Sequence, residues 1–383
     1  MNLSRNRREH SPMMLGFSFC LAFLLHLLLF SVAPMVTVLM EEMNITHAQF
    51  GFVFSSAMIS LILFRMPWGF LADRVGYVKV SKISLLLCTG FAVARAFAPS
   101  YLPLVASQFL VGLGMAAVMP CLSLMVKEWS KESPGFSTGV YVSGFAAGNA
   151  TALGLTPYLL GVMDWRQILL VYAGFSAAIC AAWLCLVKDS AATTSAIAWK
   201  DLERLLKDRS VWVLLLFLVA SMGCYDTLAT WMPKVLDMKQ FSSALASLLP
   251  LGFFVAGPVV GLLSDKIRNR RRLVGLLGML AATSMLGINY APFPVLLVCL
   301  FLVGFTTTGV TTISLTVPVE HKRLSPVAGS AVGLISSLGN IGPLLMPVLF
   351  GFLIDVTGTY HASVFSVAAL AGVVIILGSR VNE

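Results

Sequence analysis

Long apolar stretches separated by short polar segments recur along the whole chain. We count twelve, near residues 14–40, 49–72, 78–98, 101–126, 135–161, 166–187, 210–235, 243–265, 272–292, 293–316, 326–354 and 360–379. A helix needs about 20 mostly apolar residues to cross a bilayer, where every backbone amide must be paired within its own segment. The stretches are too long and uninterrupted for the short alternating strands of a β-barrel. The pattern predicts an all-α polytopic membrane protein with twelve transmembrane helices.

Composition agrees with this prediction. Of the 383 residues, 58% are hydrophobic and 11% charged, against about 45–50% apolar residues in an ordinary soluble domain. The seven cysteines all fall within apolar stretches, which is typical of small buried side chains and not of disulfides or a metal site. We find no metal-ligand cluster, nucleophile elbow or phosphate-binding loop. We therefore expect no metal, no cofactor and no enzymatic activity.

The basic residues predict an orientation. Of the 26 Lys and Arg residues, only Arg166, Lys234 and Lys239 are assigned to one side, while Arg65 and Arg95 fall within apolar stretches and the rest lie on the other side. By the positive-inside rule, we expect both termini and the central loop to be cytoplasmic. We expect a multi-pass protein of the plasma membrane, the inner membrane of a bacterium or archaeon. The net charge of +9 reflects this topology, so a role with nucleic acid is not indicated.

The chain contains an internal repeat. The segment 69–74 (GFLADR) recurs as 261–266 (GLLSDK), an offset of 192 residues, and Asp164 recurs as Asp355 at an offset of 191. Several matching offsets indicate two related halves.

We expect the halves to be residues 1–187 and 210–383, joined by a cytoplasmic linker, 188–209, with a short amphipathic helix at Trp199–Lys207. They should form two six-helix bundles related by a pseudo-two-fold axis along the membrane normal. Parallel repeats of this kind place a substrate site between the halves, near the middle of the membrane.

The repeated segment resembles a known signature. The spacing Gly69-x-x-x-Asp73-Arg74-x-Gly76-x-x-Lys79 is similar to the loop 2–3 motif of the major facilitator superfamily. A weaker copy in loop 8–9 contains Gly261, Asp265, Lys266 and Arg270. The resemblance implies a transporter that works by alternating access, with gating residues Gly69, Asp73, Arg74, Gly76, Asp265 and Lys266. A loop that merely anchors topology would explain the basic residues but not the repeated acid.

Arg65 is a charge deep within the second stretch. It lies eight residues before Asp73, about 12 Å along a helix, and charges in lipid usually face a partner or a water-filled path. The planar guanidinium suits carboxylate, nitrate-like or phosphate oxygens. Anion binding remains open beside a structural ion pair or a snorkelling side chain.

The string Phe64-Arg65-Met66-Pro67 resembles the Arg-x-Pro of the nitrate/nitrite porters, in which that arginine holds the anion. Those porters also have Gly-Asn pairs in helices 5 and 11, as this chain has at 148–149 and 339–340. The second arginine expected in helix 8 is absent, since residues 256–258 read Ala-Gly-Pro. The resemblance therefore implies a small inorganic or organic anion, including the substrates of cyanate-permease-like or monocarboxylate carriers. Glycines alone are more often helix-packing residues.

Asp226 is the only acid in the middle of a stretch. A carboxylate away from water can exchange a proton, so Asp226 is the candidate for coupling to a proton, or to sodium, with a structural partnership equally open. His26 is a second candidate for protonation and for substrate contact, although a lone histidine among leucines more often forms a structural hydrogen bond.

The remaining candidate substrate contacts are uncharged. Asn149 and Asn340 occupy equivalent repeat positions, and an amide in lipid rarely lacks a partner. Tyr141 and Tyr225, and less directly Trp231, could line the path, although aromatics often sit at membrane interfaces.

Arg95 and Gln108 are two further polar residues within the apolar stretches. Arg95 lies three residues before an Ala-Pro-Ser loop, and we expect it to snorkel at the outer face. Gln108 stands where proton-coupled members of the superfamily commonly have an arginine in helix 4.

The sequence thus predicts a monomeric secondary transporter, surrounded by lipid, that moves a small anion by symport. A proton-coupled drug or metabolite exporter is the alternative, favoured if the cavity is apolar and Arg65 is buried against Asp226. The exporter motif of helix 5 lacks its proline, since Gly148 is followed by Asn149. A transporter-like sensor is a further alternative, but the tails and linker leave little room for a signalling module.

Overall fold

Helices form every regular element in the part of the chain that the computed structural model describes, residues 2–129, 134–187, 205–267, 270–320 and 328–378. The helices of the N-terminal bundle are α1 (Asn2–Phe30), η1 (Ala33–Met35), α2 (Val36–Met43), α3 (His47–Val75), α4 (Tyr77–Ala96), α5 (Tyr101–Met115), α6 (Val118–Trp129), α7 (Pro134–Leu160) and α8 (Trp165–Leu186). Those of the C-terminal bundle are α10 (Arg209–Met238), η2 (Ser243–Ser247), α11 (Leu248–Lys266), α12 (Arg270–Tyr290), α13 (Phe293–Glu320), α14 (Ala328–Leu338), α15 (Ile341–Thr357) and α16 (His361–Gly378).

These helices occupy all twelve predicted stretches, which confirms the all-α polytopic fold. Ten described segments are long and apolar enough to cross a membrane, and α7 and α16 occupy the two remaining stretches. Spans 1, 4 and 11 are each built from two helices, α1 with α2, α5 with α6, and α14 with α15. The predicted linker helix lies mostly outside the described residues.

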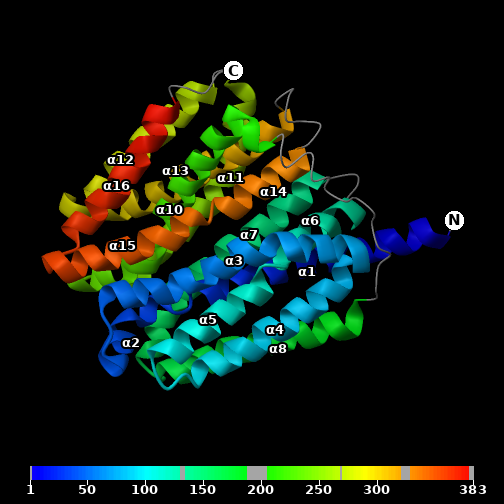
Figure 1. Ribbon diagram of the computed structural model, residues 1–383, viewed down its shortest axis with the longest axis horizontal. Coiled ribbons are helices and arrows are strands. Elements are labelled where there is room, and N and C mark those ends of the chain that lie inside the picture. The colour runs from blue at the N-terminus through cyan, green and yellow to red at the C-terminus, as the bar shows by residue number, and fades with distance from the viewer. Residues whose placement is uncertain (1, 130–133, 188–204, 268–269, 321–327, 379–383) are drawn as a thin grey trace.

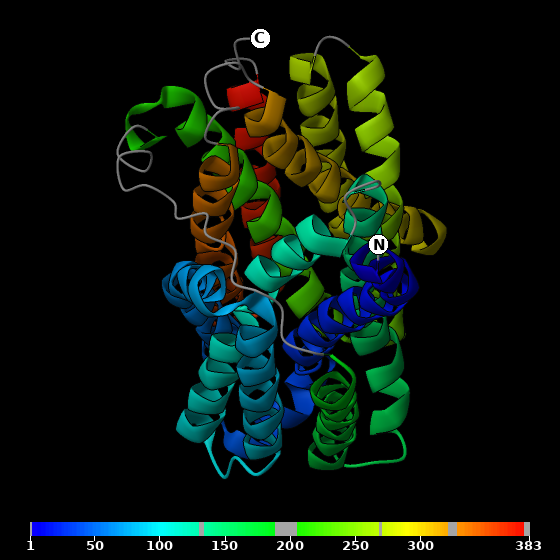
Figure 2. The ribbon, with the colours of Figure 1, turned by 90° about the vertical axis from the view of Figure 1, so that its right-hand side faces the viewer.

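The helices gather into two bundles, α1–α8 and α10–α16, which contact each other mainly through α3 with α15 and through α7 with η2 and α11 (Figures 1 and 2). The internal repeat is visible in their packing. Gly112 of α5 lies against the backbone of Ala57 in α3, and 192 residues later Gly304 of α13 lies against Leu249 of α11. A Cβ at either glycine would come closer than 3.0 Å to that backbone, so close helix approach requires glycine at both positions.

The two ends of the bundles differ in charge. We call the end with Arg74, Lys79 and Lys266 the basic end, and the opposite end, where α3 and α8 begin, the far end. The first residues of α1 and the last residues of α16 lie toward the basic end (Figure 1). Gly76, where α3 ends and α4 begins, has φ of 93°, a value that disfavours any residue with a Cβ.

The N-terminus of α3 carries its own cap at the far end. Thr46 and Gln49 form a capping box, in which each side chain accepts a hydrogen bond from the other residue's backbone N–H. Asp164 and Gln167 form the same arrangement at the start of α8. These local sequences fix where both helices begin.

Candidate functional site

Arg65 lies on α3 at the boundary between the bundles. Its side chain is half-buried, and Nη1 donates a 2.9 Å hydrogen bond to the carbonyl of Ser336 in α14 of the other bundle. The Arg65 Nε is buried without a hydrogen-bond partner, and no acid in the described ranges forms an ion pair with the guanidinium. Arg65, a cation with no counter-ion among the described residues, therefore bridges the two bundles.

Asn340 meets Arg65 at the same acceptor. The Asn340 Nδ2 donates to the Ser336 carbonyl at 2.8 Å and to the Ser337 carbonyl at 3.2 Å. Span 11 is broken here, so α14 ends with carbonyls that have no partner further along the helix. Donors from α3 and from the α14–α15 break thus converge on one carbonyl oxygen.

A second group of predicted residues forms an aromatic cluster between the bundles. The ring of His26 in α1 lies 4.7 Å from that of Phe145 in α7 and 6.3 Å from that of Phe253 in α11. The Phe253 ring lies 5.4 Å from that of Tyr225 in α10, and the Phe145 ring lies 5.8 Å from that of Tyr141. The cluster therefore draws on spans 1, 5, 7 and 8.

Asn149 joins this cluster through a hydrogen bond across the bundles. Its Nδ2 donates to the Tyr225 hydroxyl at 2.9 Å, and its side chain is fully buried. The Asn149 Oδ1 has no hydrogen-bond partner in the described part of the chain. An unpaired buried amide oxygen is costly, so this contact is available to a polar group that enters the interface.

Asp226 follows Tyr225 on α10 and is 9% exposed. No hydrogen bond or ion pair of its carboxylate is found among the residues that the structure describes, and no basic residue faces it as an ion-pair partner there. The expected structural partner for this acid is therefore not seen in the described ranges.

The glycines of spans 5 and 11 serve helix packing at several positions. A Cβ at Gly144 or Gly148 would collide with the α1 backbone at Phe19 or Phe23, and one at Gly342 would collide with α10 at Val219. Close approach of neighbouring helices within each bundle thus explains these three glycines.

The predicted gating residues lie at the basic end. Asp73 is half-buried near the end of α3, while Arg74 and Lys266 are exposed. A Cβ at Gly69 would meet Pro120 at 3.7 Å, an ordinary contact, so this conformation does not itself demand glycine there. The side chain of Asp265 lies outside the described part, and the gating roles stay predictions.

The expectation for Arg95 is wrong. Its side chain does not snorkel to the membrane surface but is fully buried, with Nη1 donating to the Leu28 carbonyl at 2.8 Å and to Gln108 Oε1 at 2.6 Å. Its Nη2 donates to Ser31 Oγ at 3.0 Å. Because α1 ends at Phe30, the guanidinium caps the carbonyl end of a broken span, and it does so beside Gln108.

Sequence reasoning also missed a contact at the far end. Asp355, at the C-terminal end of α15, accepts hydrogen bonds from the backbone N–H groups of His47 and Ala48 at 3.0 and 2.8 Å and contacts His47 Nδ1 at 2.7 Å. The repeat analysis singled out Asp355, but nothing in the sequence pointed to a partner 308 residues away. Trp231 packs nearby, 5.8 Å from the His47 ring and 5.4 Å from that of Phe50, and is fully buried.

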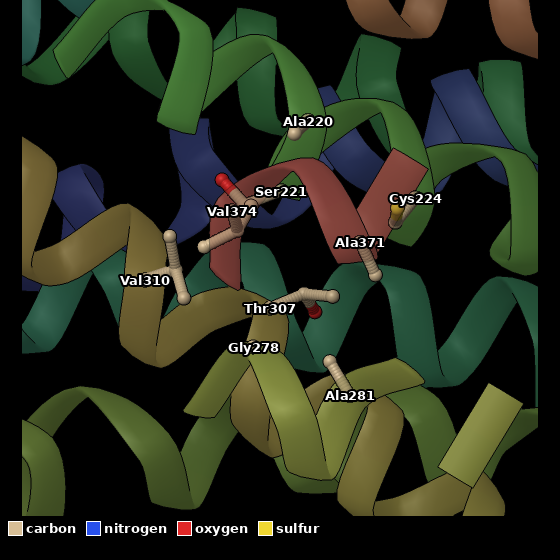
Figure 3. A pocket seen from close by; sticks show the side chains of 9 residues that line it. All are labelled: Ala220, Ser221, Cys224, Gly278, Ala281, Thr307, Val310, Ala371 and Val374. Atoms are coloured by element: carbon tan, nitrogen blue, oxygen red, sulfur yellow. The ribbon is translucent and has the colours of Figure 1, made fainter. Parts of the chain in front are cut away.

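A small hollow lies inside the C-terminal bundle, among α10, α12, α13 and α16. Its lining in Figure 3 is Ala220, Ser221, Cys224, Gly278, Ala281, Thr307, Val310, Ala371 and Val374. It has room for about one water molecule. No group of three His, Cys, Asp or Glu side chains in the described ranges is arranged to bind a metal.

Two bundles of membrane-spanning helices, with Arg65 and Asn149 making hydrogen bonds across their boundary, define a class of polytopic membrane transport proteins. The model of the Major Facilitator Superfamily matches residues 18–328 and 240–381, and the chain belongs to this family of transporters. It is not an enzyme by this membership.

Named relatives of similar length exist. The chain is 26% identical to a probable sulfoacetate transporter, SauU, of Cupriavidus necator, over 96% of this chain and 93% of that protein. It is 26% identical to a probable nitrate transporter, NarT, of Staphylococcus carnosus, over 89% and 88%. It is 25% identical to a D-galactonate transporter of Escherichia coli, over 87% and 86%.

The fold is also that of solved transporters. The nucleoside transporter NupG superposes with a TM-score of 0.80 at 14% identity, over 96% of this chain and 99% of that chain. A bacterial homolog of the human lysosomal transporter Spinster gives a TM-score of 0.74 at 14% identity, over 98% and 96%.

Proposed function

We propose that this protein is a secondary transporter that carries a small organic or inorganic anion between its two bundles by alternating access. The observation that carries the proposal is the meeting of Arg65 and Asn340 at the Ser336 carbonyl. The Ser336 carbonyl accepts hydrogen bonds from Arg65 of one bundle and Asn340 of the other. A substrate oxygen would take the place of this carbonyl oxygen as their acceptor. An anion with two oxygens could accept from the guanidinium fork and the amide together.

The relatives support this substrate class. Sulfoacetate, nitrate and D-galactonate, named for three of them, are all small anions. The guanidinium in the interface has no acid paired with it among the described residues, as an anion site requires. The aromatic cluster between the bundles, with His26, Tyr141, Asn149 and Tyr225, would contact the uncharged part of an organic substrate.

We assign coupling to Asp226. Asp226 is buried and directly follows Tyr225 on α10, and a proton on its carboxylate would remove the repulsion between that charge and a substrate anion. Proton binding and anion binding would then reinforce each other, which is the requirement for symport. Sodium is the alternative coupling ion.

The membrane arrangement follows from the charges. We propose that the basic end faces the cytoplasm of a bacterial or archaeal cell, with the protein in its inner membrane. The halves 1–187 and 210–383 would rock about the central site as a monomer. Asp73, Arg74, Gly76, Asp265 and Lys266 would contribute to the gate at the cytoplasmic face, with Gly69 beside them.

Uptake into proteoliposomes tests the proposal. Purified protein is assayed with radiolabelled nitrate, sulfoacetate and D-galactonate, and the other candidate anions compete as unlabelled solutes. Arg65→Lys keeps the charge but loses the planar fork, so we expect the KM of the transported anion to rise about tenfold or more. The matched control is Arg209→Gln, which removes an exposed charge at the start of α10.

Two outcomes would contradict the proposal. If no anion in the panel is transported and none competes, a small anion is not the substrate. An unchanged KM in Arg65→Lys and Arg65→Gln would reduce Arg65 to a cap for the end of α14, a role that its bond to Ser336 also allows.

One of the two conditions that favour the exporter alternative, burial of Arg65 against Asp226, is not met among the described residues. Arg65 bonds to the Ser336 carbonyl, and no ion pair joins Arg65 to Asp226 within the described ranges. Export of an apolar cation by the proteoliposomes, without anion uptake, would support that alternative.

A further inference from the structure

The far end holds the two bundles together through a helix N-terminus. Asp355, on α15 of the C-terminal bundle, accepts hydrogen bonds from the first two backbone N–H groups of α3, those of His47 and Ala48. The third N–H, of Gln49, is bonded to Thr46 Oγ1 within the capping box. An acid from one bundle and a threonine from the other therefore share the cap of a single helix.

The chemistry of this contact is directional. The first N–H groups of a helix have no partner inside it and carry the positive end of the helix dipole, so a carboxylate in this position is bound by charge as well as by hydrogen bonds. The His47 Nδ1 also lies 2.7 Å from the Asp355 Oδ1, the oxygen that accepts from the His47 backbone N–H. The His47 and Asp355 side chains are 21% and 25% exposed, so water can replace these contacts when the bundles separate.

The helices around this contact are packed backbone to backbone. A Cβ at Gly51 of α3 would lie 2.7 Å from the carbonyl carbon of Pro347 in α15, and a Cβ at Gly351 of α15 would lie 2.8 Å from the backbone nitrogen of Ala48. Ser55 Oγ donates to the Pro343 carbonyl at 3.3 Å, one turn further along. Any opening between the bundles at the far end has to separate this crossing.

The repeat supplies an internal comparison. Asp164 occupies the equivalent repeat position, yet it caps α8 of its own bundle by accepting from the N–H of Arg166 at 3.2 Å. One acid thus stabilises a single helix and its counterpart joins two bundles. Only the contacts of Asp355 are broken when the two bundles separate.

We propose that Asp355 is a gating residue of the transport cycle, which closes the far end by capping α3 and releases that helix when the far end opens. This inter-bundle cap, made of Asp355 and the N–H groups of His47 and Ala48, stands apart from the gate predicted at the basic end. It does not depend on which solute is carried.

A cysteine reporter at the α3–α15 crossing measures the gate. Ser55 is fully buried in the closed state, so Ser55→Cys reacts with a membrane-impermeant maleimide added on the far-end side only when the crossing opens. Cys185, which is exposed, is replaced by serine in all variants. We expect Asp355→Asn and Asp355→Ala to raise the labelling rate about two- to fivefold, the population shift that a lost charge–dipole contact allows.

Two further variants separate gating from general loosening. Asp164→Asn should leave the labelling rate unchanged, and Asp355→Glu should restore most of the slow rate. Equal rates in Asp355→Ala and the unsubstituted reporter would overturn the proposal, as would an equal rise in Asp164→Asn. If Asp355→Asn also unfolds at a lower temperature in detergent than Asp164→Asn, Asp355→Glu decides: a restored slow rate supports gating, and an unrestored rate refutes it.

His47→Gln distinguishes the helix cap from a simple ion pair. The variant loses the ring contact but keeps the backbone N–H, so it should raise labelling less than Asp355→Asn does. A rise as large as that of Asp355→Asn would show that the side-chain pair, and not the helix terminus, holds the far end.

Discussion

Arg95 should be coupled energetically to Gln108 through their 2.6 Å hydrogen bond in the core of the N-terminal bundle. Arg95→Met removes the three hydrogen bonds of the guanidinium. Leu28 keeps a partner, because Ser31 Oγ donates to the same carbonyl at 2.9 Å. Gln108 does not: its Nε2 is already unpartnered in the described part of the chain, and its Oε1 would lose the Arg95 contact.

The magnitude follows from the groups left unpaired. A buried acceptor without a partner costs about 1–3 kcal/mol, and loss of a hydrogen bond to a charged group costs about 1.5–3 kcal/mol. We therefore expect Arg95→Met and Gln108→Met each to lower the free energy of unfolding by an amount of this order. The double variant removes both partners, so it should cost about 1–3 kcal/mol less than the sum of the two.

Unfolding by SDS in mixed micelles, followed by far-ultraviolet circular dichroism, measures the three free energies of unfolding. The control cycle combines Arg65→Met with Gln108→Met. Arg65 bonds to Ser336 in the other bundle, so these two substitutions should be additive within about 0.5 kcal/mol. Additivity of the Arg95 and Gln108 substitutions would refute the buried contact.

Three further substitutions test the interface between the bundles. Gly351→Ala forces a Cβ against the α3 backbone at His47, so maleimide labelling at the α3–α15 crossing should rise, and an unchanged rate would mean that this crossing is not tight. Asp226→Asn should abolish uptake driven by an imposed proton gradient while counterflow of labelled substrate continues; gradient-driven uptake at the original rate would exclude Asp226 from coupling. Tyr225→Phe removes the acceptor of the Asn149 amide, so SDS unfolding should show a loss of about 0.6–1.7 kcal/mol, and no loss would argue against that bond in the membrane protein.

The helical fold could be predicted because lipid leaves a long apolar segment few alternatives to a helix. The internal repeat could be predicted because matching residues recur about half a chain apart. The structure has equivalent helix contacts in the two halves, at Gly112 and at Gly304. Arg95 could not be placed from the sequence. Its distance from the next loop suggests an interfacial depth but does not say which face of α4 it occupies, and that face turns toward α1.

The candidate site was predictable only in part. Polar residues such as Arg65, Asn149 and Asn340 stand out in apolar helices, whereas Phe145 and Phe253 are indistinguishable from the many apolar residues around them. The sequence also does not pair residues across the bundles. Asp355 is a repeated acid in the sequence, but its role depends on how the C-terminal bundle is set against the start of α3.

Equilibrium binding of a radiolabelled anion to the purified protein tests the central proposal most directly. Nitrate, sulfoacetate and D-galactonate are each titrated against the unsubstituted protein, Arg65→Gln and Arg209→Gln. We predict that at least one of these anions binds saturably, that Arg65→Gln weakens its binding about tenfold or more, and that Arg209→Gln binds it unchanged. Equal affinity in Arg65→Gln, or no saturable binding of any of the three anions, would contradict an anion site at Arg65.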